Sequence, residues 1–419
     1  MKSKLATDIK KFLILDLYNA ANKGDAAILE GLILSLKKEI PHSLFIIHTP
    51  FPASVRYQPD LVVRNSLITH FVNSNKRAIY TLITCLALIL CALLARLKLN
   101  LFYLLPERYK VPFSDFLQAD IIVGMGGGFY NDNYWVALPG RLCHLLIGKL
   151  LGKPVVISAH SFGPFKSRMA QILAYLGLNI TDALCVRDSC SLQTLKALKI
   201  KDKKIHKVAD SAWLVDKISE EQARRLLEDQ MIDLSQPLLI SLSARRWDYY
   251  HTVGNSEGHA CYVNALAKAL DVIIEKYRAL IIYLSTCHEP DRQVGLEIKH
   301  QLKHMNKFQI LKGEYEPSQL KGMYDFVDLH IGTRMHSVIL ALSVGTPSIG
   351  ISYEPKLVSL MEEIGLQDFV VDIENVEAMR IVSMVEMMIA KREEIVTTLQ
   401  REIPRLQQLA QKNAQIITH

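Results

Sequence analysis

The chain has 419 residues, half of them hydrophobic and 22% charged, a composition that is typical of a folded protein and excludes a disordered one. At this length we expect two or three domains, each large enough to bury its own core. The formal net charge of +7 is compatible with an anionic substrate or an anionic membrane surface, but it is too small and too dispersed to indicate nucleic-acid binding.

The N-terminal run "FLILDLY" (12–18) is interrupted by Asp16 and lacks a small-residue cleavage site, so it predicts a first strand rather than a signal peptide. The seven cysteines form no CxxC pair, and their odd number argues against a disulfide framework. These thiols indicate a reducing compartment, and we predict a cytoplasmic protein.

One segment, residues 79–95, carries no charge and is flanked by cationic residues on both sides: Lys76, Arg77, Arg96 and Lys98. Its length is at the lower limit for crossing a bilayer, and a buried core helix would also account for it. A single span would place the predicted strands 12–17 and 120–124 on opposite sides of the membrane. We therefore expect residues 77–98 to form an insert that attaches, as a peripheral or monotopic element, to the inner face of the cytoplasmic membrane.

Short β-rich runs alternate with helical segments along the rest of the chain, which predicts parallel sheets wrapped by helices. The predicted strands are 12–18, 43–49, 120–126, 154–160, 183–188 and 204–210, followed by 237–243, 279–285, 307–313, 326–332, 346–352 and 368–373. A polar, helix-prone stretch separates the two series and places a domain boundary near 217–236.

This pattern predicts two Rossmann-like, doubly wound α/β domains that face a cleft. Residues 1–225 form the N-terminal domain, which we assign to the acceptor, and residues 236–382 form the C-terminal domain, which we assign to the donor. Residues 383–419 are expected to form one or two further helices.

Ligands of such sheets bind at the carboxyl ends of the strands, so the residues that follow each strand are candidates for the site. After the first strand, Asn22, Gly24 and Asp25 open an apolar helix; helix capping explains them, and acceptor binding by Asn22 and Asp25 is the alternative. After the third, Gly126, Gly127 and Gly128 expose backbone amides, which favours acceptor contact over a simple tight turn.

Charged residues follow two other strands. Arg187 and Asp188 read best as a structural ion pair that caps the next helix. Arg245 and Arg246 end the first strand of the second series, where two guanidinium groups suit recognition of a carboxylate or phosphate, although a solvated basic rim explains them about equally well.

The stretch "GTRMHSVILALSVGTPSIGISYEPK" (332–356) is the densest of these junctions. Arg334, His336 and Ser337 lie at the start of a predicted apolar helix, where free amides and the helix dipole favour an anion. A protonated histidine is poorly placed there for stability, which indicates proton transfer instead. The next strand brings Tyr353 and Lys356 to the same edge of the sheet.

These motifs resemble the polysaccharide pyruvyl transferase family. The resemblance rests on "NKGD", "GGG", "FGP", "VRD", "ADSAW" and the 332–356 stretch in that order; it extends over about residues 12–370 and is most specific at 324–366. It implies a GT-B-like pair of domains and transfer of pyruvate from phosphoenolpyruvate to saccharide hydroxyls as a ketal, with release of phosphate. No cofactor is expected.

By this resemblance Arg334 and His336 match the Arg-x-His motif of donor binding and catalysis, with Met335 where the family often has leucine, and Arg245 matches the strand-end arginine. We assign catalysis to His336 and Arg334, and donor binding to Arg245, Arg246, Arg334, Ser337, Tyr353 and Lys356. Asp25 and Glu354 are the two candidates for the carboxylate partner of His336. The apolar insert leaves open whether the acceptor is soluble or lipid-linked.

Two other classes of function remain as alternatives: a GT-B glycosyltransferase that uses a nucleotide sugar, and a non-enzymatic scaffold at the membrane surface. The scaffold leaves His336 and the three glycines unexplained. No metal site is predicted, because His300 and His304, four residues apart on a predicted helix, have no evident third ligand.

Overall fold

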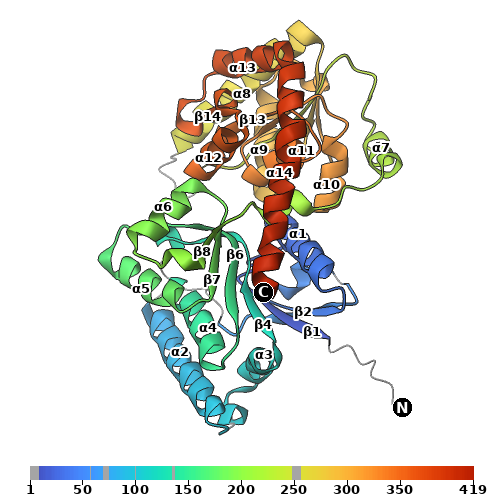
Figure 1. Ribbon diagram of the computed structural model, residues 1–419. Helices are drawn as coiled ribbons and strands as arrows, with labels where there is room; N and C mark the ends of the chain where they lie inside the picture. Colours follow the sequence, from blue (N-terminus) through green and yellow to red (C-terminus); the bar gives the residue numbers. More distant parts are fainter. Residues whose placement is uncertain (1–8, 57, 69–74, 100, 135–136, 248–255) are drawn as a thin grey trace, which may run out of the picture. The chain divides into compact units, whose positions relative to one another are not determined.

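The structure is a computed structural model that describes residues 9–56, 58–68, 75–99, 101–134, 137–247 and 256–419 (Figure 1). The side chains of residues 75–79, 256 and 288 are also outside the description. The predicted cationic flank at Lys76 and Arg77 therefore lies outside the described side chains.

The chain forms two compact units. Unit 1 comprises Met1–Ala20, Ile28–Leu214 and Leu409–His419, and unit 2 comprises Ala21–Ala27 and Val215–Gln408. The sequence-based division placed the boundary near 217–236 and kept 383–419 apart. The structure differs because helices α1 (Lys23–Glu39) and α14 (Arg392–Thr418) each contain residues of both units, an arrangement that the order of elements along the chain does not reveal.

Among its described residues, unit 1 contains an eight-stranded parallel sheet in the order β3-β2-β1-β4-β6-β7-β8, with β5 paired to β6. The strands are β1 (Lys10–Leu15), β2 (Ser43–Thr49), β3 (Leu61–Asn65), β4 (Ile121–Gly124), β5 (Gly127–Tyr130), β6 (Val155–Phe162), β7 (Ala183–Val186) and β8 (Ile205–Lys207). The helices are α2 (Asn75–Arg96), α3 (Glu107–Gln118), α4 (Leu138–Leu150), α5 (Arg168–Asn179) and α6 (Ser189–Ala197).

The two faces of this sheet carry separate cores. One core includes side chains from α2, α3, α4 and α5, and the other includes the unit 1 part of α1 and the last turns of α14 (Figure 1). The central strands are buried on both faces, as expected for parallel strands that read as continuous apolar runs.

Unit 2 contains, in the part of the chain that is described, a six-stranded parallel sheet in the order β11-β10-β9-β12-β13-β14. The strands are β9 (Leu239–Ser243), β10 (Leu280–Tyr283), β11 (Phe308–Ile310), β12 (Leu329–Gly332), β13 (Ser348–Ser352) and β14 (Val370–Asp372). The helices are α7 (Glu220–Glu228), α8 (Ser256–Tyr277), α9 (His288–Gln301), α10 (Pro317–Tyr324), α11 (Met335–Leu342), α12 (Pro355–Ile364) and α13 (Ala378–Ala390).

All twelve predicted strands are present within the described residues, and the predicted parallel α/β class is confirmed. Two strands were not predicted. β3 is a short strand at the edge of the sheet, and β5 contains Gly127 and Gly128, for which the sequence favours acceptor contact over a simple tight turn.

Helix α2 contains the apolar segment 79–95 and has two different faces. Cys85, Leu88 and Ala92 are buried in the core of unit 1, whereas Leu86 and Leu90 are exposed. The helix thus contributes to the core along one stripe only. Among the described residues there is no helix with the length and apolar character needed to cross a membrane.

Candidate active site

The sheet of unit 2 has a topological switch point between β9 and β12. From β9 the chain proceeds to β10 and β11 on one side, and then returns to β12, β13 and β14 on the other. Arg245 lies two residues beyond the end of β9, and Arg334 two residues beyond the end of β12. The two arginines therefore flank the position where doubly wound sheets bind their ligands.

Arg334 forms a two-pronged ion pair with Asp291. Its Nε donates to Oδ2 at 2.9 Å and its Nη2 to Oδ1 at 2.7 Å. The Asp291 side chain is fully buried, whereas that of Arg334 is 15% exposed. Burial lowers the pKa of Arg334, but the charge and hydrogen bonds of Asp291 outweigh burial and raise the pKa above its usual value. The guanidinium stays charged, and its Nη1 lies outside this pair.

Asp291 is held in place by the first turn of α9. Its backbone N–H donates to the carbonyl of Cys287, and its own carbonyl accepts from the Tyr283 hydroxyl at 2.5 Å. The same hydroxyl oxygen lies 2.8 Å from the carbonyl of Ala244, next to Arg245. Tyr283 thus connects the segment that carries Arg245 with the residue that pairs with Arg334.

His336, in the first turn of α11, packs directly against the first turn of α1, which contains Gly24. A Cβ atom at position 24 would lie 2.5 Å from Nδ1 of His336, so only glycine leaves room for this imidazole. Residues Ala21–Ala27 belong to unit 2, and the predicted acceptor residues Asn22 and Asp25 therefore lie in the same unit as His336.

The start of α1 is fixed by a local hydrogen bond and by backbone contacts with residues 286–287. The Asn22 side-chain carbonyl accepts from the N–H of Gly24 at 3.0 Å, which supports its interpretation as a turn-forming residue. Asn22 also forms a bridge with Cys287, and the N–H of Lys23 donates to the carbonyl of Thr286. Burial raises the pKa of the Cys287 thiol, and Arg334 partly offsets that effect.

Arg245, Tyr353 and Lys356 converge as predicted. The guanidinium carbon of Arg245 lies 3.9 Å from the centre of the Tyr353 ring, and Nζ of Lys356 lies 5.9 Å from it. Lys356 also pairs with Glu354 at 2.5 Å. Arg246 follows Arg245 in the chain and is exposed.

Ser337, a predicted donor-binding residue, forms its hydrogen bonds within the protein. Its hydroxyl is fully buried, donates to the carbonyl of Arg334 at 2.7 Å and lies 3.0 Å from Nε2 of His330. Its position three residues after Arg334 explains why it bonds back to the helix start. Burial lowers the pKa of His330 to about 3, so this histidine is neutral.

The switch point of unit 1, between β1 and β4, also carries charges, but they neutralise each other. Asp16 accepts from Arg141 at 2.9 Å and from the Tyr130 hydroxyl at 2.8 Å. Arg141 is 5% exposed and Asp16 3%. Burial raises the pKa of Tyr130 well above its usual value, with Asp16 as the next contributor.

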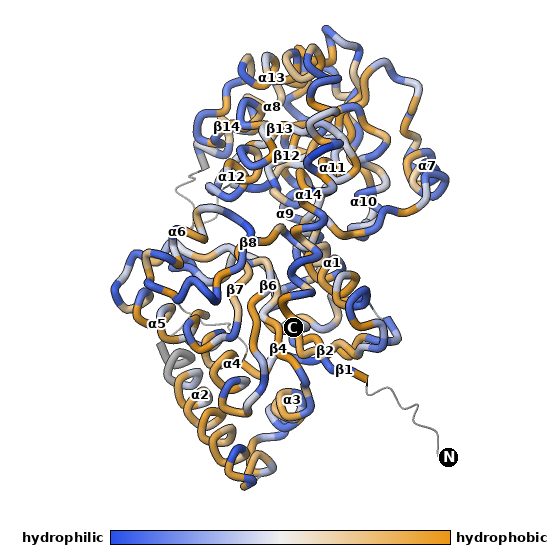
Figure 2. Tube along the Cα trace, viewed as in Figure 1, coloured by the Kyte–Doolittle hydropathy of each residue, from blue (hydrophilic) through white to orange (hydrophobic). Residues whose placement is uncertain are grey.

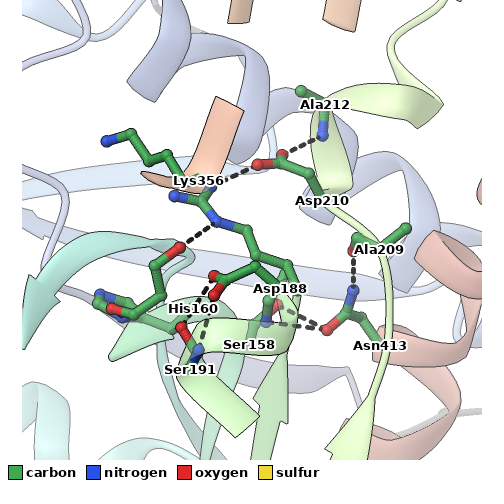
Figure 3. A network of polar contacts seen from close by, with 12 residues as sticks. Ser158, His160, Asp188, Ser191, Ala209, Asp210, Ala212, Lys356 and Asn413 are labelled. Atoms are coloured by element: carbon green, nitrogen blue, oxygen red, sulfur yellow. Dashed lines mark hydrogen bonds and ion pairs between the residues drawn. The ribbon is translucent and has the colours of Figure 1, made fainter. Parts of the chain in front are cut away.

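A second buried network follows β7 (Figure 3). Asp188 caps α6 by accepting from the N–H of Ser191 at 2.7 Å, which confirms the predicted cap. The predicted pairing of Arg187 with Asp188 is wrong: Arg187 pairs with Asp210, because Asp188 is committed to the helix start. Asn413 of α14 accepts from Ala159 at 3.0 Å and donates to Ala209 at 3.0 Å.

The three glycines after β4 lie close to β6. Gly126 and Gly127 are buried, and a Cβ at position 126 would lie 3.0 Å from the carbonyl oxygen of Ala159. These two glycines are therefore needed for packing, and Gly128 is partly exposed.

The described residues contain no group of three or more His, Cys, Asp or Glu side chains that could hold a metal ion. His300 and His304 were expected to share a helix, but α9 ends at Gln301 and His304 instead lies 3.0 Å from Glu275. The helix ends there because Leu302 has extended backbone.

Sequence reasoning missed Asp291 and the contact between Gly24 and His336. The signal for Asp291 was its position in "TCHEPD", directly after the predicted strand 279–285 at the same edge of the sheet as Arg334. The Gly24 contact had no comparable signal, because 312 residues of chain separate the two positions.

Solved structures that also contain two Rossmann-like units define the fold class as GT-B-like. The chain is similar to UDP-GlcNAc 2-epimerase from Methanocaldococcus jannaschii, with a TM-score of 0.54, 14% identity and coverage of 91% of this chain and 92% of that one. It is also similar to Anabaena Alr3699/HepE in complex with UDP, with a TM-score of 0.56, 10% identity and coverage of 98% and 100%. At these identities the likeness concerns the fold alone.

Residues 22–355 match the family model described as polysaccharide pyruvyl transferase, and the chain belongs to this family. It is also similar to the amylovoran biosynthesis protein AmsJ of Erwinia amylovora, with 27% identity over 407 residues that cover 94% of this chain and 95% of AmsJ. The match includes the NKGD turn and the helix start with Arg334 and His336.

Proposed function

We propose that the protein transfers pyruvate from phosphoenolpyruvate to two hydroxyls of a saccharide, forming a pyruvate ketal and releasing phosphate. The observation that carries this proposal is the pair of arginines at the switch point of unit 2, with His336 two residues beyond Arg334. Family membership supports the reaction type.

The donor carries a phosphate and a carboxylate, and the site offers cationic groups for both. Arg334 is oriented by Asp291 and retains Nη1 for a ligand, while Arg245 is stacked on Tyr353 with Lys356 on the same ring. Planar guanidinium groups suit both anions. The first amides of α11 add donors at the positive end of the helix.

The reaction needs proton transfers but no redox step. His336 delivers a proton to the methylene carbon of phosphoenolpyruvate, which becomes the methyl group, and C2 becomes open to attack by the first hydroxyl. The second hydroxyl attacks C2 as the C2–O bond to phosphate breaks. One of the two hydroxyl protons returns to His336 and replaces the proton that was given to the methyl group. The other leaves with the phosphate. No cofactor or metal is required.

We assign Asp25 as the carboxylate that orients His336. Asp25 is buried and adjoins Gly24, against which the imidazole packs, whereas the carboxylate of Glu354 pairs with Lys356. An oriented imidazole keeps one tautomer and one direction for proton transfer.

The acceptor that we propose is a cell-surface polysaccharide or its lipid-linked precursor, with Asn22 as a binding residue. The similarity to a protein named for amylovoran biosynthesis supports this class of acceptor. The free thiols among the described residues support a cytoplasmic location.

Phosphate release from phosphoenolpyruvate, measured with a panel of soluble and lipid-linked saccharides, tests the proposal. We expect release that depends on both substrates, a product heavier by the pyruvate ketal, and loss of release in His336→Gln. Consumption of a UDP-sugar without phosphate release would overturn it in favour of a glycosyltransferase, the activity that the UDP-bound structures of this fold make the main alternative.

A further inference from the structure

The exposed large apolar side chains of the described residues are unevenly distributed. Sixteen of the 22 lie in just two segments, between Tyr80 and Val111 and between Met169 and Leu176. On α2 they include Leu82, Leu86, Leu90 and Leu93, spaced at three to four residues, so they form one stripe along the helix. Soluble monomers rarely expose apolar surface in this concentration.

A second stripe lies on α5, where Met169, Ile172 and Leu176 are exposed at the same spacing. Both helices pack on α4, which lies between them and is largely buried. Cys143 of α4 reaches the carbonyl of Cys85 on α2, and Leu142 of α4 touches Gly177 of α5. We call the exposed apolar side chains of α2 and α5, the two helices that flank α4 in unit 1, the apolar face; Figure 2 shows the trace of α2 as largely hydrophobic.

The two helices of the apolar face carry cations but no carboxylates, and the nearest acidic residues to α5 are Asp132, which bonds to the backbone N–H of Ser167, and Asp182, which pairs with Lys149. Residues 76–106 and 162–181, which contain α2 and α5, include no Asp or Glu. Arg96 and Lys98 are exposed at the end of α2, and Lys166 and Arg168 at the start of α5. Each lysine or arginine near an anionic lipid surface contributes about 1 kcal/mol to the free energy of membrane binding.

These observations together select a lipid surface as the occupant. A symmetric dimer through the apolar face would bring together the same cations of two helices that have no acidic residue of their own. The buried side of α2 is part of the core of unit 1, so the helix can enter a bilayer with its outer side only. We propose that α2 and α5 lie in the plane of an anionic membrane, with the apolar face embedded among the headgroups and upper acyl chains of one leaflet.

This inference does not depend on the proposed function and would hold for any activity of the chain. It extends the expectation for residues 79–95 by adding α5, whose amphipathic pattern was not recognised in the sequence. The attachment would hold unit 1 at the surface where lipid-linked saccharides are found.

Cosedimentation of the full-length protein with phosphatidylcholine vesicles, with and without phosphatidylglycerol, tests the proposal. We expect the protein to pellet with the anionic vesicles, and the double variants Leu86→Glu/Leu90→Glu and Ile172→Glu/Leu176→Glu each to lower the partition coefficient by about tenfold or more. Met231→Glu/Met379→Glu, two exposed methionines of unit 2, is the matched control and should bind like the wild type.

Circular dichroism and thermal unfolding show whether each variant is folded, and Arg96→Glu/Lys98→Glu tests the charge without changing the apolar side chains. Absence of binding to anionic vesicles, or equal binding by the α2 variant and the control, would overturn the proposal. A wild-type dimer that the α2 variant converts to a monomer, without vesicle binding, would assign the apolar face to a second copy of the chain instead.

Discussion

At the switch point of unit 1, Arg141 and Asp16 form an ion pair that is almost completely buried, and Arg187 and Asp210 form another after β7. At the switch point of unit 2, Arg334 pairs with the buried Asp291, whereas Arg245 is partly exposed and stacks on Tyr353. The same residue types thus occupy equivalent edges of two similar sheets in different electrostatic states.

The difference indicates which charges are available to a ligand. In a buried ion pair, each charge has lost its water and is stabilised by its partner. Removing one member therefore leaves a buried charge with neither water nor a counter-charge. A partly exposed guanidinium on an aromatic ring stays in contact with solvent, and its removal costs little stability. We therefore expect changes in unit 2 to affect activity and changes in the buried pairs of unit 1 to affect stability.

The largest effect is expected at His336. His336→Gln should lower the rate of phosphate release by about 10²–10⁴-fold, because proton transfer by a positioned side chain contributes a factor of this size. Steady-state kinetics with phosphoenolpyruvate measures the rate, and thermal unfolding should be unchanged. His304→Gln, an exposed histidine of the same unit, is the control; a similar loss there would show that histidine removal acts through the fold.

The next largest effect should appear in unit 1, as a loss of stability. Arg187→Ala leaves the Asp210 carboxylate buried without its cation, and should lower the free energy of unfolding by about 3–5 kcal/mol. Urea unfolding measures this difference. Arg245→Ala in unit 2 should cost less than about 1 kcal/mol but raise the KM for phosphoenolpyruvate. The proposed difference between the units is wrong if Arg245→Ala costs more stability than Arg187→Ala, or if Arg187→Ala raises the KM and Arg245→Ala does not.

Gly24 tests how closely the start of α1 positions the imidazole. Gly24→Ala places a Cβ against Nδ1 of His336, and the resulting displacement should lower kcat by about 10–100-fold. Gly24→Ala/His336→Gln should be no slower than His336→Gln alone, because residues that act as a unit are not additive. A further loss in the double variant would give Gly24 a role separate from the imidazole.

His330 predicts a pH dependence of stability in unit 2. Burial lowers its folded pKa to about 3, whereas in the unfolded chain it binds a proton near pH 6.5. Between about pH 6.5 and pH 3 the unfolded state therefore holds one more proton than the folded state. As the pH is lowered through this range, His330 should decrease the free energy of unfolding by about 1.4 kcal/mol for each pH unit. Urea unfolding of the wild type and of His330→Gln between pH 7 and pH 5 should show this difference in slope.

Equal slopes for the two proteins would mean that His330 is already protonated in the folded state. Such a proton would have to be accommodated between Ser241 and Ser337, which lie 2.8 and 3.0 Å from the two ring nitrogens.

The strands could be predicted because parallel strands are buried on both faces and read as short apolar runs between turns. β5 could not, because "GGFY" has the composition of a turn and is a strand only through its pairing with β6. The helix start at Arg334 was predictable from local signals, since Gly332 and Thr333 precede an apolar periodic segment.

The site was predictable where neighbours along the chain supply it, as for Arg334 and His336. Asp291 and Gly24 reach the same place from other elements, and their contacts depend on the packing of the sheet. The inward direction of Ser337 is local in origin, because its hydroxyl bonds to the carbonyl of Arg334 and lies against His330 of the preceding strand, β12.

The chain passes between the two units four times, after Ala20, Ala27, Leu214 and Gln408. A fragment that stops at Leu214 would therefore lack Asn413, whose amide group satisfies the backbone of Ala159 and Ala209 in unit 1. A fragment that starts at Val215 would lack Gly24 and the first turn of α1, against which His336 packs. Neither half can be studied as an independent catalytic or binding module, and gene fusions or truncations at the apparent domain boundary would remove parts of both.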